Sequence, residues 1–237
     1  MRLFSRASGE DAAEFRVSSD SSLLVYFGHE IALAAHERVR RLLYLLQQEP
    51  IAAVVNLHPA YCSILVKFDP LRATHEEIEA SLRGYLRRAE KVKLPRSREI
   101  EIPVCYGGEF GPDFEDVCAQ RGLTEQDAVG LHSGREYIVY FLGFVPGFAY
   151  LGELDARIAT PRLDTPRKEV PAGSVGIAGS QTGVYPVTTP GGWRLIGRTP
   201  MHMFQSDGDG KSLLAIGDRV RFAPISRERF GELERSA

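Results

Sequence analysis

The chain has 237 residues, of which 43% are hydrophobic and 25% are charged, values that are ordinary for a globular protein. Its 29 lysines and arginines nearly balance 31 acidic residues, which argues against a dedicated nucleic-acid-binding protein, because such proteins usually carry a basic excess. No segment approaches the run of about 18 apolar residues that spans a membrane, and the beginning of the sequence lacks the apolar run of a secretory signal. The sequence therefore predicts a cytoplasmic protein that binds neither nucleic acid nor a membrane.

The first part of the chain alternates between strand and helix patterns. The predicted elements are, in order, a strand at 22–27, a helix at 31–48 and strands at 51–57 and 61–68. A second helix is expected to begin after Thr74, because Thr74 and Glu77 have the spacing of a capping box. This β-α-β-β-α order, followed by one more strand, predicts a ferredoxin-like (βαββαβ-type) domain over residues 1–95, which ends in the charged, proline-containing segment 91–97.

The second part, residues 96–237, has a different pattern. An alternating strand at 99–104 precedes two short helices, which begin near Pro112 and Thr124, and a buried strand follows at 137–142. Short apolar segments then recur between turns, at 174–178, 184–188, 193–196, 213–216 and 219–222. Many short strands with turn residues between them predict a closed or nearly closed β-barrel, so the whole chain is expected to be an α+β protein of two domains.

Glycine is distributed unevenly between these two parts. Twenty of the 23 glycines follow residue 97, and residues 143–200 contain 10 glycines and 7 prolines. Such a density is typical of disordered chain, but disordered segments are poor in aromatic residues. The same segment contains Phe144, Phe148, Tyr150, Tyr185 and Trp193, so it is expected to be ordered.

Three stretches of this segment suggest a polar pocket: 143–151 (GFVPGFAYL), 160–167 (TPRLDTPR) and 173–199. Glycines allow backbone N–H groups to approach a ligand closely. The cations that could meet carboxylate or phosphate oxygens are Arg162, Arg167, Lys168, Arg194 and Arg198, and the neutral hydrogen-bonding groups are Ser174, Gln181, Thr182 and Tyr185. The alternative for each residue is structural, with glycines at barrel corners and arginines paired with surface acids.

Neither a metal site nor a catalytic base is evident, because the three cysteines form no CxxC pair and the histidines are scattered. The segment 208–212 (GDGKS) lacks the first glycine of a phosphate-binding loop and predicts a turn.

These same stretches, together with 213–225 (LLAIGDRVRFAPI), resemble the KipI / allophanate hydrolase subunit 1 family. The resemblance implies a ferredoxin-like first domain and a cyclophilin-like β-barrel second domain. It also implies a subunit of an ATP-dependent 5-oxoprolinase, which converts 5-oxo-L-proline to L-glutamate with a PxpC-like companion subunit, related to allophanate hydrolase subunit 2. ATP, with Mg, is the expected cofactor, and no biotin is expected on this chain.

For this chemistry we expect Arg162, Arg167, Lys168 and Arg198 to supply positive charge. Ser174, Gln181, Thr182 and Tyr185 would line the substrate or nucleotide pocket. Phe144, Phe148, Tyr150 and Trp193 would wall the pocket or contact the companion subunit, and a place in the barrel core is the alternative. Two other functions stay open: a KipI-like protein inhibitor of a sensor histidine kinase, and a subunit of a urea or allophanate amide hydrolase.

Overall fold

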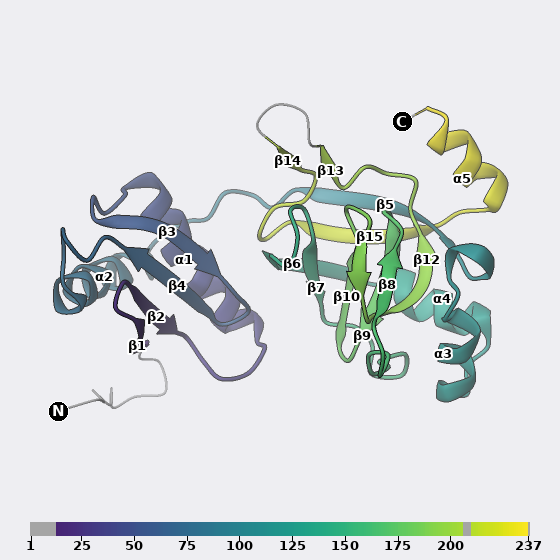
Figure 1. The fold of residues 1–237 in the computed structure, drawn as a ribbon, viewed down its shortest axis with the longest axis horizontal. Helices are drawn as coiled ribbons and strands as arrows, with labels where there is room; N and C mark the ends of the chain where they lie inside the picture. Colours follow the sequence, from purple (N-terminus) through teal and green to yellow (C-terminus); the bar gives the residue numbers. More distant parts are fainter. Residues whose placement is uncertain (1–12, 206–209, 237) are drawn as a thin grey trace. The chain divides into compact units, whose positions relative to one another are not determined.

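The computed structural model describes residues 13–205 and 210–236, and the chain divides into two compact units, residues 1–96 and 97–237. Both units contain helices and strands (Figure 1), so the expectation of an α+β chain is confirmed.

The first unit is a four-stranded antiparallel sheet with two helices. Its elements are, in order, β1 (Glu14–Ser19), β2 (Ser22–Tyr26), α1 (Leu33–Gln48), β3 (Val54–Pro59), β4 (Ser63–Phe68) and α2 (His75–Ala89). The strands lie side by side in the order β1-β2-β4-β3. The helices contact each other and the sheet. Leu23, Val25 and Ile64 of the sheet and Val39 and Leu82 of the helices are fully buried. The predicted capping box at Thr74 is present.

The sheet's fourth strand is not where the sequence pattern puts it. Within the described residues, the segment after α2, residues 91–97, contains no strand, and β1 occupies the sheet edge next to β2 instead. Pro95 lacks a backbone N–H and is therefore a poor strand residue, whereas β1 is a largely exposed edge strand with only a faint apolar pattern. The order is therefore ββαββα rather than βαββαβ, and the ferredoxin-like and cyclophilin-like assignments stay predictions.

The second unit is built on a closed barrel with strand order β10-β7-β6-β15-β5-β12-β9. Its strands are β5 (Glu99–Tyr106), β6 (Glu136–Leu142), β7 (Ala149–Gly152), β9 (Ser174–Ala178), β10 (Gln181–Val184), β12 (Arg194–Arg198) and β15 (Arg219–Pro224). Only β5 and β15 pair in parallel; the other barrel pairs are antiparallel. The predicted barrel is thus present.

The second unit also contains shorter helices and two-stranded ribbons besides the barrel. They are η1 (Gly108–Phe110), α3 (Phe114–Arg121), α4 (Glu125–Ser133), the ribbon of β8 (Arg167–Val170) with β11 (Thr189–Gly191), the ribbon of β13 (Phe204–Gln205) with β14 (Lys211–Ser212), and α5 (Arg227–Glu234). The predicted strand at 213–216 is absent, since its residues follow β14 as bend and turn, and β10 ends at Val184, before most of the predicted 184–188. Of the segment 208–212, residues 208 and 209 lie outside the described residues, and 211–212 form β14.

Among the described residues of the second unit, buried side chains gather in a larger and a smaller cluster. The larger fills the barrel with aliphatic and aromatic residues such as Val139, Val175 and Val220. The smaller contains Phe148, Val170, Ala178, Tyr185, Trp193 and Leu195. Three of the aromatic residues singled out in the sequence therefore pack together in a cluster of their own.

Candidate functional site

A cavity of about 280 Å³ lies in the second unit beside this smaller cluster. It is lined by Phe144, Phe148, Tyr150, Arg162, Pro166, Tyr185, Pro190, Gly191, Gly192 and Trp193. These residues come from the loop between β6 and β7, from β7, from the segment before β8, and from the stretch that runs through β11 to β12. The three sequence stretches that suggested a pocket thus meet at one place.

Phe148 is the centre of the aromatic wall. Its ring centroid lies 5.0 Å from that of Tyr150 and 5.3 Å from those of Tyr185 and Trp193, in edge-to-face arrangements. Phe144 adds a further edge-to-face contact at 5.7 Å. Rings at these distances and angles attract one another beyond the area they bury, so the wall is held firmly.

Phe144 is presented to the cavity by a strained turn. Its φ is +70°, and among the described residues it is the one non-glycine with positive φ. The turn is closed by hydrogen bonds from Val145 N to the Gly143 oxygen and from Phe148 N to the Val145 oxygen. The residue is 60% exposed. Strained residues persist where the surroundings enforce them and concentrate at functional sites, which makes this exposed ring a strong candidate for ligand or companion-protein contact.

Glycine is required where the aromatic rings meet the backbone. A Cβ on Gly191 would lie 2.5 Å from the Tyr185 hydroxyl oxygen, and one on Gly183 would lie 3.1 Å from Phe148 and 3.3 Å from Trp193. No side chain fits at Gly191 without displacing the Tyr185 ring. The backbone of the β11–β12 stretch consequently forms one side of the cavity.

Arg162 brings a positive charge to this aromatic cavity. Burial raises the pKa of Tyr185, and the backbone of Trp193 and the Arg162 charge only partly oppose that rise. Burial likewise raises the pKa of Tyr150, again opposed by Arg162. Both hydroxyls are therefore protonated at neutral pH and able to donate hydrogen bonds, next to an exposed guanidinium.

The structure gathers six of the residues proposed from the sequence around this cavity: Phe144, Phe148, Tyr150, Arg162, Tyr185 and Trp193. It places the other cations elsewhere. Arg167 pairs with the buried carboxylate of Asp113 at 2.6 Å, and Arg198 donates from Nε to the Ala172 oxygen at 2.9 Å. Lys168 is exposed on β8.

The proposed neutral groups also lie away from the cavity lining, apart from Tyr185. Ser174 is buried in β9, and Gln181 is half-buried on β10. Thr182 is fully buried and donates its hydroxyl proton to the Gly176 oxygen at 3.0 Å. Ser174 and Thr182 are thus buried side chains of the barrel strands β9 and β10 and lie outside the lining of this cavity, and their role in ligand binding stays a prediction.

Sequence reasoning does not single out His132, which lies fully buried beside Thr182. Its Nε2 lies 2.9 Å from the Thr182 hydroxyl oxygen and its Nδ1 lies 2.7 Å from the Tyr106 hydroxyl. The Thr182 hydroxyl donates its single proton to the Gly176 oxygen, so it can only accept from His132. His132 therefore donates from Nε2 to Thr182 and accepts at Nδ1 from the Tyr106 hydroxyl. Burial lowers the pKa of His132 to about 3, so the ring is neutral and serves as an internal link. A helical residue far from Tyr106 and Thr182 in sequence gives no local sign of this contact.

Within residues 13–205 and 210–236, no group of three or more histidine, cysteine or acidic side chains is arranged to hold a metal ion. The same residues contain no helix that is both long and apolar enough to cross a membrane.

Residues 13–214 match the family model of the carboxyltransferase domain, subdomains C and D. The chain is 40% identical to the B subunit of 5-oxoprolinase from Bacillus subtilis, over 89% of this chain and 92% of the relative. It is 48% identical to the B subunit of 5-oxoprolinase from Escherichia coli O157:H7, over 82% of this chain and 88% of the relative. A crystal structure of a conserved uncharacterized protein from Pyrococcus horikoshii is 49% identical and aligns with a TM-score of 0.55, covering 91% of this chain and 99% of that one.

Proposed function

This chain belongs to the family of 5-oxoprolinase B subunits, and we propose that it is one component of an ATP-dependent enzyme that opens 5-oxo-L-proline to L-glutamate. It works in the cytoplasm with a PxpC-like companion subunit and is inactive without it. ATP, bound with Mg, supplies the free energy, and this chain carries no biotin.

The aromatic cavity of the second unit is the observation that supports this proposal most directly. The substrate is a small, flat five-membered lactam with one carboxylate, and a 280 Å³ cavity walled by Phe148, Tyr150 and Trp193 suits a ring of that size. Arg162 binds the substrate carboxylate with its guanidinium, an interaction that is strong because it combines charge with paired hydrogen bonds. The protonated hydroxyl of Tyr185 donates to the substrate.

The reaction activates the lactam oxygen. That oxygen attacks the γ-phosphorus of ATP, ADP leaves, and a water adds to the activated carbon so that the ring C–N bond breaks and the nitrogen takes up a proton. A second water then releases inorganic phosphate and leaves glutamate. Charge develops on phosphoryl oxygens in the first step, so cationic donors beyond Arg162 are needed. We assign those donors to the companion subunit, because Arg167 and Arg198 are engaged by Asp113 and Ala172.

The experiment is to co-express the chain with its companion subunits, purify the complex and measure ATP hydrolysis that depends on 5-oxoproline. Arg162→Gln should raise the KM for 5-oxoproline by about tenfold or more, since a charged hydrogen-bonded pair contributes about 1.5–3 kcal/mol. Arg229→Gln is the matched control, because Arg229 is an exposed arginine of the same unit that forms an ion pair with Glu232 on α5, outside the cavity lining.

A complex that assembles but hydrolyses no ATP in response to 5-oxoproline contradicts the proposed activity. An active complex in which Arg162→Gln and Arg229→Gln have the same KM as the unmodified chain contradicts the proposed site. A chain that forms no active complex but inhibits a sensor histidine kinase would favour the KipI-like alternative.

A further inference from the structure

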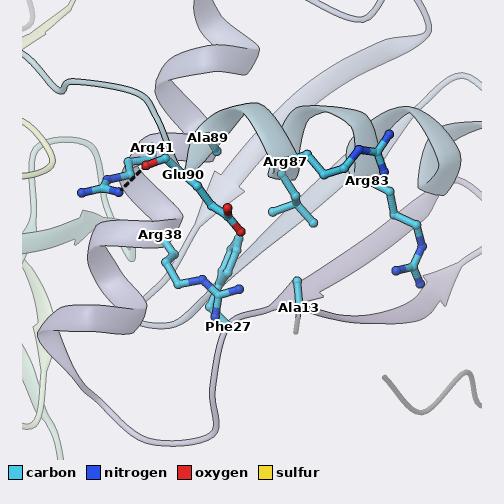
Figure 2. Close-up of a pocket in the computed structure, with 9 residues that line it drawn as sticks. Ala13, Phe27, Arg38, Arg41, Arg83, Arg87, Ala89 and Glu90 are labelled. Atoms are coloured by element: carbon cyan, nitrogen blue, oxygen red, sulfur yellow. Dashed lines mark hydrogen bonds between the residues drawn. The ribbon is translucent and has the colours of Figure 1, made fainter. Parts of the chain in front are cut away.

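A second cavity, of about 600 Å³, lies in the first unit and is lined mainly by residues of α1 and α2. Figure 2 shows that the guanidiniums around it point in different directions. Arg41 and Arg83 pair with Glu37 and Glu79, each one turn away on the same helix. The charges of this lining therefore do not meet at one point, whereas the polar groups behind the aromatic cavity of the second unit do.

The hairpin of β9 and β10 separates the barrel core from the aromatic cluster. Within it Gly176 pairs with Gly183, and Ile177 pairs with Thr182. Successive residues of a strand point to opposite faces, so these two pairs lie on opposite faces of the hairpin. Ile177 belongs to the cluster that fills the barrel, whereas Ala178 belongs to the aromatic cluster. The glycine pair consequently faces the aromatic cluster, and Thr182 faces the barrel core.

The glycine pair lies directly against the aromatic rings. A Cβ on Gly176 would lie 3.1 Å from the Cβ of Trp193 and 3.4 Å from the Tyr185 ring. A Cβ on Gly183 would lie 3.1 Å from the Phe148 ring and 3.3 Å from the Trp193 ring. Three rings of the cavity wall thus rest on the backbone of the hairpin. A slip of one residue would turn the larger side chains of the core face against these rings.

Thr182 fixes the hairpin from the barrel side. Its hydroxyl donates to the Gly176 oxygen at 3.0 Å, which ties β10 to one of the two glycines, and it accepts from His132 Nε2 at 2.9 Å. His132 is fully buried on α4, where its Nδ1 accepts from the Tyr106 hydroxyl and its backbone oxygen accepts from the Tyr137 hydroxyl, both at 2.7 Å. A buried polar network in which each member has its partners makes its surroundings rigid.

We propose that Thr182 and His132 are positioning residues for the aromatic cavity. The hydrogen bonds from His132 to Thr182 and from Thr182 to Gly176 hold the hairpin where its glycines accept the rings. Neither side chain lines the cavity, so their effect reaches a ligand only through the aromatic wall. That this ligand is 5-oxoproline rests on the function proposed above, whereas the placement of the rings is a property of this chain alone.

The first experiment reads the ring positions in the isolated chain. Trp193 is the single tryptophan, it is buried, and it belongs to the wall, so its emission without denaturant reports the wall in the folded protein. Thr182→Val removes the hydroxyl and keeps a similar shape, and we expect emission at longer wavelength and stronger quenching by acrylamide. Thr182→Ser retains the hydroxyl and should keep the emission of the unmodified chain.

Thr199→Val is the matched control. Thr199 is a buried threonine of the same unit, outside the cavity lining, whose hydroxyl oxygen accepts from the backbone N–H of Met201 at 3.2 Å. Its loss should lower the stability of the unit but leave the emission of folded Trp193 unchanged. The comparison separates a specific effect on the wall from general destabilisation.

The second experiment measures turnover of 5-oxoproline by the complex with the companion subunits. Thr182→Val should raise the KM by about fivefold, the factor equivalent to the net free energy of one hydrogen bond, and change kcat by less than about twofold. Thr182→Ser should restore the KM of the unmodified chain.

The positioning role is overturned if Thr182→Val leaves the emission and quenching of Trp193 unchanged, or if Thr182→Ser or Thr199→Val alters them equally. If Thr182→Val does not fold, His132→Leu and His132→Gln decide: Leu removes the donor to Thr182 and should shift the emission, whereas Gln retains an N–H donor and should not, and equal spectra would overturn the role. An emission shift with the KM unchanged, in a complex where Arg162→Gln also leaves the KM unchanged, would support the positioning role and contradict only the 5-oxoproline site.

Discussion

Removal of the Arg167 guanidinium should destabilise the second unit rather than act on a ligand directly. Asp113 is buried, and its Oδ1 accepts from Arg167 at 2.6 Å while its Oδ2 accepts from the backbone N–H of Leu195 at 2.7 Å. Arg167 in turn pairs across the β8–β11 ribbon with Gly191, which lines the aromatic cavity. Asp113 thereby ties β12 to the ribbon that forms one cavity wall.

The magnitude follows from how buried each partner is. Breaking a fully buried ion pair costs about 3–5 kcal/mol, because a charge is left without compensation, whereas an exposed pair contributes about 0.2–1 kcal/mol. The Asp113 side chain is 5% exposed and that of Arg167 is 29% exposed, and Arg167 Nη1 has no partner among the described residues. Arg167→Met should therefore lower the free energy of unfolding by about 2 kcal/mol, an intermediate value.

The assay is urea unfolding, monitored through tryptophan fluorescence. Trp193 is the chain's single tryptophan and belongs to the second unit, so its emission reports that unit alone. The melting temperature should fall by about 4–8 °C for Arg167→Met. In a double-mutant cycle with Asp113→Asn, which keeps an acceptor for the Leu195 N–H, the two changes should couple by about 2 kcal/mol.

Arg157→Met is the matched control, because Arg157 pairs with Asp155 at 2.8 Å while its side chain is 69% exposed. It should cost no more than about 0.5 kcal/mol. If Arg167→Met is as stable as Arg157→Met, and the cycle shows no coupling with Asp113, the reasoning is refuted. A rise in KM without loss of stability would then restore Arg167 to the ligand-binding role expected from the sequence.

Two further predictions concern the cavity and the buried histidine. Gly191→Ala should raise the KM for 5-oxoproline in the assembled enzyme about tenfold, because its Cβ would lie 2.5 Å from the Tyr185 hydroxyl and push the ring into the cavity, at a typical overpacking cost of about 1–3 kcal/mol. Gly130→Ala, at a glycine of α4 outside the cavity where a Cβ would meet no atom within 4 Å, should leave the KM unchanged, and equal KM values in both variants would contradict this. Burial lowers the pKa of His132 to about 3, so between pH 6.5 and 3 the histidine is protonated in the unfolded chain but neutral in the folded chain. The free energy of unfolding should therefore fall by about 1.4 kcal/mol for each unit by which the pH is lowered in this range. The unfolding free energy of His132→Gln, measured by the same fluorescence from pH 7 to 4, should fall less steeply than that of the unmodified chain; parallel curves would contradict the assignment.

Local patterns are sufficient to predict much of the fold. Apolar spacing places both ends of α1 within about two residues, the capping box at Thr74 places the start of α2, and short strands separated by glycine-containing turns indicate the barrel. The errors fall where strand identity depends on pairing. β1 is an exposed edge strand that becomes a strand only by lying beside β2, and 213–216 is apolar because Leu214 packs into the barrel core, without any strand pairing.

The site is predictable only in part, for a similar reason. Aromatic residues close to glycines in a short stretch can be recognised from the local sequence, and this pattern identifies Phe144, Phe148 and Tyr150 as residues of the cavity lining. Which arginine reaches the cavity is decided by partners far away in sequence. Arg162 and Arg167 occupy equivalent places in a repeated Thr-Pro-Arg, yet only Arg167 meets Asp113, which precedes it by 54 residues. One carboxylate therefore separates a structural arginine from a candidate ligand-binding one.

The excess of glycine in the second unit has a specific cause at the cavity. Gly176, Gly183 and Gly191 each lie where a Cβ would press on the rings of Tyr185, Phe148 or Trp193. Of these three, Gly191 lines the cavity, and the absence of a side chain there leaves its peptide group beside the Tyr185 ring. Glycine and aromatic residues are thus two parts of one arrangement, in which the strands supply the side of the cavity and the rings supply its wall. Each ring packs against a glycine from another segment, so a larger residue at the glycine should be accepted only when the ring is made smaller at the same time. A smaller side chain at Tyr185 should therefore relieve the clash that Gly191→Ala creates.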